Sequence, residues 1–410
     1  MRDANHTLRL ADALPVYVRI GLLSFGGPAA QMALMQDEIV ARRGWVDGGA
    51  FQRGLNVAML LPGPEAQQLA TWLGWRLHGV AGGLAAGLAF ILPGAGLMIL
   101  LAWIAARYGD VGLVGAVFYG VQPAVLILVA RALRALAGRA VSTPLHWALA
   151  GAAFVGIWAL GLPFPLIVAA AGAAGILLLP NTGESGPGAS GLAWGGPLRI
   201  IVVSLGLIVG VALAVELVFG AEPFRDVAAL FTTAAFVSFG GAYALLPYVA
   251  ERAVETYGWL TAAEMLNGLA IAEATPGPLI LVNVYSGFYA GHSAGWGALT
   301  AALACFYTFA PSFMLILAAA PYVEAMQSVR WIRRALAGVS AAVVGVILNL
   351  TVYLGEAALF PDGLTAAPAW PKLALLVALV ALSFVVRLGM MQLVCIGAAA
   401  GLALHAAGLI

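Results

Sequence analysis

The chain alternates long apolar segments with short polar or glycine-rich turns along most of its length. Long apolar segments lie at residues 79–106, 111–136, 144–161, 163–180 and 198–220. A helix needs about 20 mostly apolar residues to cross a bilayer, and these segments approach or exceed that length. The pattern predicts an all-α polytopic membrane protein with several full spans.

Two shorter pairs of segments precede these spans, and a glycine and proline motif interrupts each pair. Residues 6–23 and 29–43 flank a Ser-Phe-Gly-Gly-Pro motif, and residues 51–61 and 66–77 flank a Pro-Gly-Pro motif. Proline lacks the N–H that continues a helix and disfavours helical backbone in the residue before it, so each motif ends one helix and begins another. Irregular backbone within a bilayer needs protein or water around it. We therefore expect broken-helix hairpins that dip into the membrane and line a cavity.

The same order of motifs occurs twice. The Ser-Phe-Gly-Gly motif at 24–27 recurs at 238–241, and the Pro-Gly-Pro motif at 62–64 recurs at 276–278. The spacing between the copies is the same for both motifs (238 − 24 = 276 − 62). We expect a tandem duplication, in which paired breaks in the two halves indicate a transporter's substrate site.

The duplication divides the chain into three parts. We expect a first repeat over residues 1–180, a linker loop with a connecting transmembrane helix over 181–221, and a second repeat over 222–410.

Arginine placement indicates how the two halves are oriented. Basic residues of the first half gather near 131–139, at the end of a long span, whereas those of the second half gather one loop earlier, near 330–334. Because basic loops stay in the cytoplasm, this shift predicts that one half is inverted relative to the other, with helix 198–220 as the odd span between them. The same rule predicts about nine spans and four dipping segments, a cytoplasmic loop at 181–197, a cytoplasmic N-terminus and a periplasmic C-terminus.

Composition narrows the function classes. Of the 410 residues, 63% are hydrophobic and 9% are charged, which excludes an ordinary soluble domain. The 19 basic and 18 acidic residues nearly balance, so nothing indicates a nucleic-acid partner. The two cysteines and five histidines lack metal-ligand spacing, and no phosphate-binding loop, His-Glu-x-x-His or Gly-x-Ser-x-Gly motif is present. We therefore expect no metal, no cofactor and no enzyme, but a transport step that draws its energy from an ion gradient.

The breaks also indicate what the cavity binds. Four helix N-termini, after Gly27, Pro64, Gly241 and Pro278, are expected near one pseudo-twofold axis. Free N–H groups and the positive end of the helix dipole make such termini binding sites for anions. The hypothesis is an oxyanion site shared by both halves. The alternative is that the glycines allow close helix packing and the prolines only bend helices.

The motifs resemble those of one family. Ser-Phe-Gly-Gly-Pro, an acidic stretch with Arg-Arg-x-Trp, and then Leu-Pro-Gly-Pro followed closely by glutamine are similar to the chromate ion transporter family in its long-chain, two-domain form. The resemblance covers residues 8–408. It implies an inner-membrane protein that carries chromate outward, driven by the proton motive force, with sulfate as a close mimic. Gln31 stands where the family often places a histidine, and Glu65 and Glu273 stand where it has a small residue and a glutamine.

Four charged residues are candidates for roles at the breaks. Glu65 and Glu273 are candidates for proton coupling, because protonation of a carboxylate beside an anion would link the two events; alternatively, Glu65 caps its helix. Arg19 or Arg53 is a candidate for the positive charge opposite the anion, and the alternative for both is a side chain that extends to the membrane interface.

Amide side chains are candidate hydrogen-bond donors to the oxyanion. Gln67, Gln68 and Asn283 follow the two Pro-Gly-Pro motifs, and an equal alternative is that they bond helix to helix. The complete set of candidate substrate-binding residues is Phe25, Gly26, Gly27, Pro28, Pro62, Gly63, Pro64, Gln67, Gly240, Gly241, Pro276, Gly277, Pro278, Asn283, Arg19 and Arg53.

The leading hypothesis for function is secondary transport of a tetrahedral oxyanion, with chromate first. An uptake carrier for sulfate or molybdate is the nearest alternative, and an uncoupled channel or lipid scramblase is an alternative of another class. The expected partners are the oxyanion, a proton and the lipid bilayer. A homodimer is a further hypothesis, since Gly82, Gly83 and Gly87 form a helix face suited to close packing, either between chains or within one.

Overall fold

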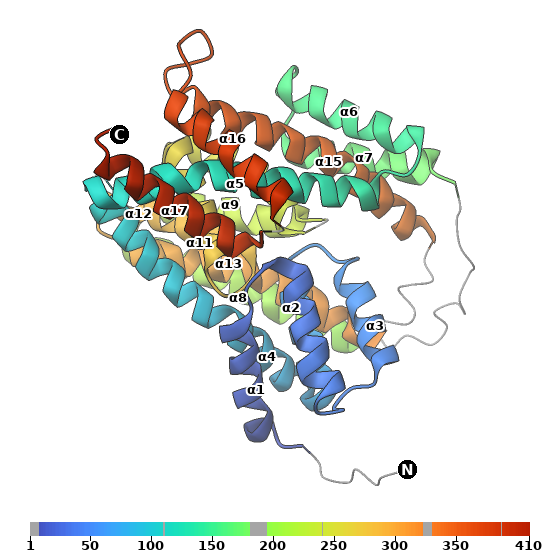
Figure 1. Cartoon of the computed structure of the whole chain (residues 1–410). Coiled ribbons are helices and arrows are strands. Elements are labelled where there is room, and N and C mark those ends of the chain that lie inside the picture. Colours follow the sequence, from blue (N-terminus) through green and yellow to red (C-terminus); the bar gives the residue numbers. More distant parts are fainter. Residues whose placement is uncertain (1–7, 110, 181–194, 240, 323–329, 387) are drawn as a thin grey trace.

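The computed structural model describes residues 8–109, 111–180, 195–239, 241–322, 330–386 and 388–410, and every regular element in these ranges is helical (Figure 1). The first half contains α1 (Leu10–Leu23), α2 (Gly27–Met35) with a π-helical continuation (Gln36–Ala41), α3 (Gly48–Ala58), α4 (Glu65–Tyr108), α5 (Gly112–Ala140), α6 (Pro144–Trp158) and α7 (Phe164–Leu178). After the connecting helix α8 (Gly195–Phe219), the second half contains α9 (Phe224–Val237), α10 (Ala242–Ala250) with a π-helical continuation (Glu251–Thr256), α11 (Ala262–Ala274), a 3₁₀ turn (Leu279–Leu281), α12 (Val282–His292), α13 (Gly297–Ala319), a 3₁₀ turn (Ala320–Tyr322), α15 (Arg330–Leu359), α16 (Trp370–Val385) and α17 (Met390–Ala406).

The helices confirm an all-α polytopic membrane protein. Within the described residues, five helices are long and apolar enough to cross a membrane: α4, α5, α8, α13 with its 3₁₀ turn, and α15. Four further apolar helices, α6, α7, α16 and α17, are shorter, at 15 to 17 residues. At a rise of 1.5 Å per residue they extend only about 22–26 Å, less than the roughly 30 Å hydrocarbon core. The predicted spans at 144–161 and 163–180 are therefore shorter in the structure than in the sequence pattern.

Helix α4 is a hairpin of two helices rather than one rod. The backbone leaves helical geometry at His78 and Gly79, where Gly79 has a φ of 63°. The limb before this kink folds back on the limb after it: a Cβ at Gly74 would lie 2.2 Å from the carbonyl oxygen of Gly82. This reversal confirms the predicted boundary between the short limb 66–77 and the span that starts at residue 79.

The small-residue face of α4 is used inside the chain. A Cβ at Gly87 would lie 2.4 Å from Thr71 Oγ1 and 2.3 Å from the Phe313 ring, and Gly83 faces Thr71 and Leu317. These glycines therefore pack against the preceding limb of α4 and against α13. Of the two alternatives for this face, packing between chains or within one chain, these contacts favour the second.

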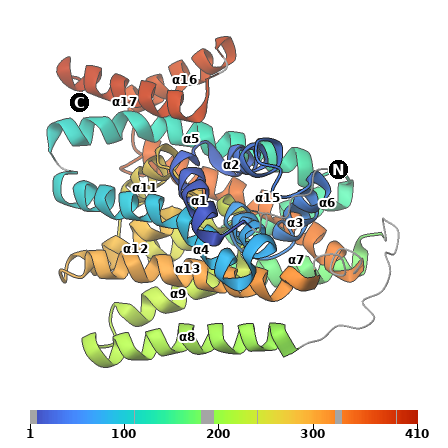
Figure 2. The same ribbon diagram turned by 90° about the horizontal axis from the view of Figure 1, so that it is seen from below.

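The two halves exchange their last helices. Helices α6 and α7 of the first half pack against α15 of the second, and α16 and α17 of the second half pack against α5 of the first. In Figure 2, α16 and α17 lie along α5, at the edge of the molecule opposite α8. The sequence pattern did not predict this exchange.

Glycine contacts show that the exchange is reciprocal. A Cβ at Gly120 would lie 2.1 Å from the Gly397 carbonyl oxygen, and a Cβ at Gly338 would lie 2.3 Å from the Ala171 carbonyl oxygen. Gly338 is the counterpart of Gly120 in the duplication, because the prolines at 93 and 311 recur at the same spacing (338 − 120 = 311 − 93). Mutual contacts of this kind are what a twofold relation produces.

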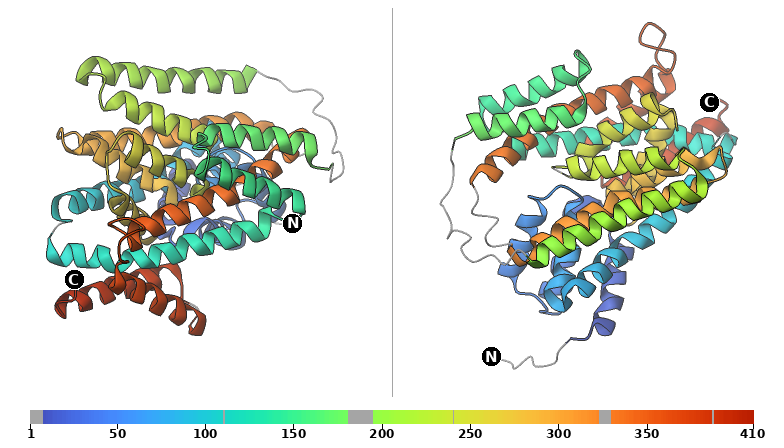
Figure 3. Two further views of the ribbon diagram at one scale, coloured as in Figure 1. Left: turned by 90° about the horizontal axis from the view of Figure 1, so that it is seen from above. Right: turned by 180° about the vertical axis from the view of Figure 1, so that it is seen from behind.

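The connecting helix α8 lies at the periphery, where Figures 2 and 3 agree in placing it outside the packed helices. It packs on α13 and α9, and only Pro197 and Ile208 of its 25 residues are buried. A helix that is apolar on all sides and exposed along most of its length is suited to lipid contact. Residues 181–194 of the predicted cytoplasmic loop lie outside the described part of the chain.

Candidate functional site

The four helix breaks meet through two backbone hydrogen bonds. The Gly63 amide of the first Pro-Gly-Pro motif donates to the Ser238 carbonyl at 2.8 Å, and the Gly277 amide of the second motif donates to the Ser24 carbonyl at 2.9 Å. The two donors and the two acceptors have the same spacing along the chain (277 − 63 = 238 − 24), so the two bonds are equivalent under the duplication. Each half thus provides the hydrogen-bond acceptor for the glycine amide in the Pro-Gly-Pro motif of the other half.

The two central glycines have backbone conformations that side chains disfavour. Gly63 has a φ of 125° and Gly277 a φ of 101°. A Cβ at Gly63 would also lie 2.7 Å from Ser312 Oγ in α13, while Gly94 of α4 lies so close to the Pro276 carbonyl oxygen that a Cβ there would be 2.1 Å from it. Each Pro-Gly-Pro turn therefore rests against the proline-containing helix of the opposite half.

Side-chain amides satisfy carbonyl groups that the breaks free from helical bonding. Gln31, 1% exposed, donates from Nε2 to the Gly277 carbonyl at 2.7 Å and to the Ser24 carbonyl at 3.3 Å. Gln68 donates from Nε2 to the Pro62 carbonyl at 2.7 Å. Irregular backbone at membrane depth requires such partners. Gln68, one of the predicted donors to the oxyanion, thus donates to the protein's own backbone. The hydrogen bonds of Gln31 were not predicted, although this residue was noted because the family often has a histidine there.

The two serines at the breaks differ in their hydroxyl groups. Ser24 donates its hydroxyl to the Ile20 carbonyl one turn earlier in α1. The hydroxyl of Ser238 is buried, and no described residue serves as its partner. A buried donor without an acceptor is unfavourable by about 1–3 kcal/mol, so such a group is well suited to a ligand or water. Neither serine was a candidate residue, and the sequence motif does not distinguish the two.

The predicted amide donors Gln67 and Asn283 are bonded between side chains. Gln67 donates to Thr71 Oγ1 at 2.8 Å and accepts from the Ser312 hydroxyl at 2.6 Å, which joins α4 to α13. Asn283 donates to Thr308 Oγ1 at 3.1 Å, which joins α12 to α13. These contacts favour the helix-to-helix alternative for their amide donors.

Both candidate coupling acids lie near the start of α10. Glu65 is the first residue of α4, and a Cβ at Gly241 would lie 3.8 Å from its Oε1. Glu273 is 7% exposed in the last turn of α11 and accepts a hydrogen bond from the Tyr243 hydroxyl. Gly241 and Tyr243 both belong to the start of α10, so carboxylates from the two halves approach the same helix terminus. Gly240 lies outside the described residues.

The candidate arginines lie near acidic groups that do not belong to the turns. Arg19 lies 3.7 Å from Glu38, whose buried carboxylate also pairs with Arg42 at 3.4 Å and with Arg43. Arg53 lies near Asp47, the N-cap of α3. The structure thus gives Arg19 a partner in the dipping segment 29–43. It also leaves three guanidinium groups around one buried carboxylate.

A buried lysine belongs to a network that sequence reasoning missed. Lys372, 9% exposed in α16, donates to Gln122 Oε1 at 2.6 Å and lies 4.6 Å from the Tyr119 ring centroid. Gln122 in turn donates to Asn267 Oδ1 at 2.9 Å, which links α5 to α11, the limb that ends at the second Pro-Gly-Pro turn. The available signal was that Lys372 is the only lysine in the chain.

In the described part of the chain no three His, Cys, Asp or Glu side chains converge. Around the paired helix breaks lie backbone amides, the Ser238 hydroxyl and the carboxylates of Glu65 and Glu273.

Comparison of the sequence with known proteins identifies the family of this chain. The family described as chromate transporter matches the chain twice, over residues 12–176 and 225–402. A chromate transport protein of Pseudomonas aeruginosa is 32% identical over 351 residues, covering 83% of this chain and 80% of the relative. A probable chromate transport protein of Synechococcus elongatus is 30% identical over 374 residues, covering 88% of this chain and 89% of the relative.

A more distant relative agrees with these two. A chromate transport protein of Cupriavidus metallidurans is 26% identical over 362 residues, with 85% of this chain and 84% of the relative covered. No solved structure matches the chain. Because the family matches well over half of the residues, in two copies, the chain belongs to the chromate transporter family.

Proposed function

We propose that this chain is a secondary carrier of chromate in the cell inner membrane and that it exports chromate with energy from the proton motive force. The relatives named as chromate transport proteins support the substrate. The observation that carries the proposal is the reciprocal pair of bonds from Gly63 to Ser238 and from Gly277 to Ser24, which joins the breaks of both halves at one place.

Helix termini supply the positive potential for a dianion. Most first-turn amides of α2, α4 and α10 have no acceptor within their own helices; the exceptions are Pro28, which lacks an N–H, and Ala244, which donates to the Gly241 carbonyl. The helix dipole adds a partial positive charge at each N-terminus. The free Ser238 hydroxyl adds a donor at the same place. A tetrahedral oxyanion has acceptor oxygens in several directions, so donors converging from both halves suit its shape.

Glu65 and Glu273 are the proposed coupling groups. A carboxylate near an anion repels it, and protonation removes that repulsion, so proton and oxyanion occupancy become linked. Tyr243 faces Glu273 and donates a hydrogen bond to it from its hydroxyl. A proton would then bind and leave together with the oxyanion. With fewer than two protons per dianion the transported species stays negative, and the inside-negative membrane potential, which is part of the proton motive force, drives it outward.

Proteoliposomes test the carrier and its coupling together. Chromate trapped with the purified protein should move against its own gradient when a pH gradient is imposed, and it should not do so without one. Glu65→Gln, which keeps the side-chain shape, should bind chromate but lose most of the dependence on the pH gradient. Sulfate, which stays a dianion at neutral and mildly acidic pH, separates protonation of the protein from protonation of the substrate.

The same assay distinguishes the alternatives. Equilibration without accumulation would indicate a channel, and lipid movement without oxyanion transport would indicate a scramblase. Preferential accumulation of sulfate or molybdate in the inward direction would favour the uptake carrier. Inverted halves, a cytoplasmic N-terminus and a periplasmic C-terminus belong to the proposal on the strength of the arginine distribution.

A further inference from the structure

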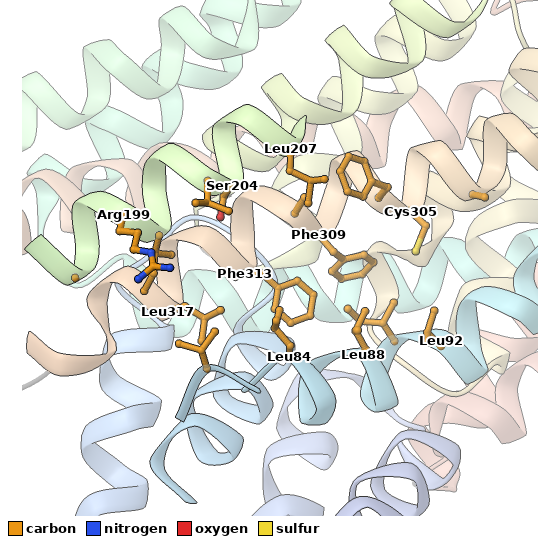
Figure 4. A pocket seen from close by; sticks show the side chains of 18 residues that line it. Leu84, Leu88, Leu92, Arg199, Ser204, Leu207, Cys305, Phe309, Phe313 and Leu317 are labelled. Atoms are coloured by element: carbon orange, nitrogen blue, oxygen red, sulfur yellow. The ribbon is translucent and has the colours of Figure 1, made fainter. Parts of the chain in front are cut away.

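A wide apolar groove lies between α4, α8 and α13 (Figure 4). Helix α13 packs against both α4 and α8 and forms the floor, while α4 and α8 form the walls. The groove has a volume of about 830 Å³. Its apolar lining includes Leu84, Leu88, Leu92, Leu207, Phe309 and Phe313.

The length of the groove matches one leaflet of a bilayer. Along α4 the lining extends from Val80 to Leu92. At a rise of about 1.5 Å per residue this stretch is about 18 Å long, close to the roughly 15 Å of half a hydrocarbon core. An extended acyl chain of one leaflet therefore fits the groove end to end.

The charge at one end of the groove is positive. Figure 4 shows Arg199 beside Leu317 at one end, with Cys305 and Leu92 at the other. No acidic residue is among the described residues that line the groove. Arg199 is exposed and lies near the start of the described part of α8. Since α8 has 25 residues, or about 38 Å, it is longer than the hydrocarbon core, and the long side chain of Arg199, at the start of the second turn, can reach the headgroup region.

We propose that this groove is a binding site for a membrane phospholipid, with one acyl chain between α4 and α8 and the phosphate bonded to Arg199. Guanidinium groups bind phosphate through charge-assisted hydrogen bonds. Helix α8 makes its main contacts with α13 and α9 of the second half. The lipid fills the space between α8 and α4 of the first half. None of the residues that line the groove belongs to the helix breaks.

Native mass spectrometry of the purified full chain tests the proposal. The detergent-solubilised protein is titrated with phosphatidylglycerol, with diacylglycerol, which has the same acyl chains without phosphate, and with inorganic phosphate. Phosphatidylglycerol should bind with one high-affinity molecule per chain, diacylglycerol more weakly, and phosphate alone without measurable affinity. Arg199→Gln should weaken phosphatidylglycerol binding by about tenfold, the size of one charge-assisted hydrogen bond.

Two variants make the result specific. Arg107→Gln removes another exposed arginine, near the end of α4 and outside the groove, and should leave binding unchanged. Ala302→Phe fills the groove from α13 and should abolish the high-affinity molecule. Equal binding by wild type and Arg199→Gln, or equal affinity for phosphatidylglycerol and diacylglycerol, would overturn the proposal. So would a dimer that dissociates with Ala302→Phe, because the groove would then hold a second copy of the chain.

Discussion

At the scale of single residues, hydrogen-bond partners decide what the repeated motif does in each half. Ser24 and Ser238 occupy equivalent positions, and both carbonyls accept from a glycine of the opposite half. Their hydroxyls differ, because Ser24 donates within its own helix and Ser238 has no partner among the described residues. The duplication is therefore symmetric in its backbone and asymmetric in its side chains.

Ser238→Ala tests whether the free hydroxyl belongs to the oxyanion site. Loss of a hydrogen bond to a charged ligand should weaken chromate binding by about tenfold or more. Ser24→Ala is the matched control, and it should change affinity little, because that hydroxyl is already used by the helix. Binding is measured by isothermal titration of the purified protein. Equal losses in the two variants would argue against a special role for Ser238.

The lysine network gives a second prediction at this scale. Gln122→Leu leaves the buried Lys372 ammonium without its acceptor and should destabilise the protein by about 1–3 kcal/mol. Replacing both residues, as Gln122→Leu with Lys372→Met, should recover the part of that loss that comes from the unpaired ammonium, while the lost bond to Asn267 is common to both variants. Melting temperatures in detergent compare the variants. A double variant as unstable as Gln122→Leu would show that the bond is not the cause.

The sequence predicted the glycines and prolines of the site but not their partners. Proline and glycine affect backbone geometry locally, so the breaks at 62–64 and 276–278 can be located from the chain alone. Gln31 bonds to a carbonyl 246 residues away, and such a contact leaves no local pattern. The network of Lys372 was missed for the same reason, since the only signal in the sequence was that the chain contains a single lysine.

At the scale of elements, the lengths of the apolar segments and the positions of helix-breaking residues predicted where most helices begin and end. The reversal at His78 and Gly79 and the long connecting helix α8 agree with the pattern. The lengths of α6 and α7 were overestimated, because apolar residues continue past the helix ends into the turns. The exchange of α6–α7 and α16–α17 between halves could not be predicted, because pairing between helices depends on tertiary contacts.

The exchanged contacts predict which small residues are essential. Gly120→Ala and its counterpart Gly338→Ala each place a methyl group within 2.3 Å of backbone in the opposite half, and each should destabilise the fold by about 1–3 kcal/mol. Gly138→Ala, also in α5, has open space at its Cβ position and should be neutral. Thermal unfolding in detergent measures the differences. Similar melting temperatures for Gly120→Ala and Gly138→Ala would contradict close packing of the exchanged helices.

At the scale of the whole molecule, the reciprocal contacts indicate a twofold relation between the halves, and arginine placement predicts its direction. If the halves are inverted, equivalent loops lie on opposite sides of the membrane. Ser142→Cys in the loop after α5 and Asp362→Cys in the loop after α15 test this, in a chain whose Cys305 and Cys395 are replaced by alanine. An impermeant thiol reagent should label Asp362→Cys from the periplasm and leave Ser142→Cys unlabelled. Labelling of both would indicate parallel halves.

The proposed oxyanion site, built by both halves where their breaks meet, has a stoichiometry that can be measured. Isothermal titration of the purified chain with chromate gives the number of binding sites. One substitution in each half, Gly63→Ala in the first and Ser238→Ala in the second, shows which half contributes to binding. We expect one chromate per chain and weaker binding at that single site in both variants. Two independent sites per chain, or a change that leaves the affinity intact in either half, would contradict a shared site.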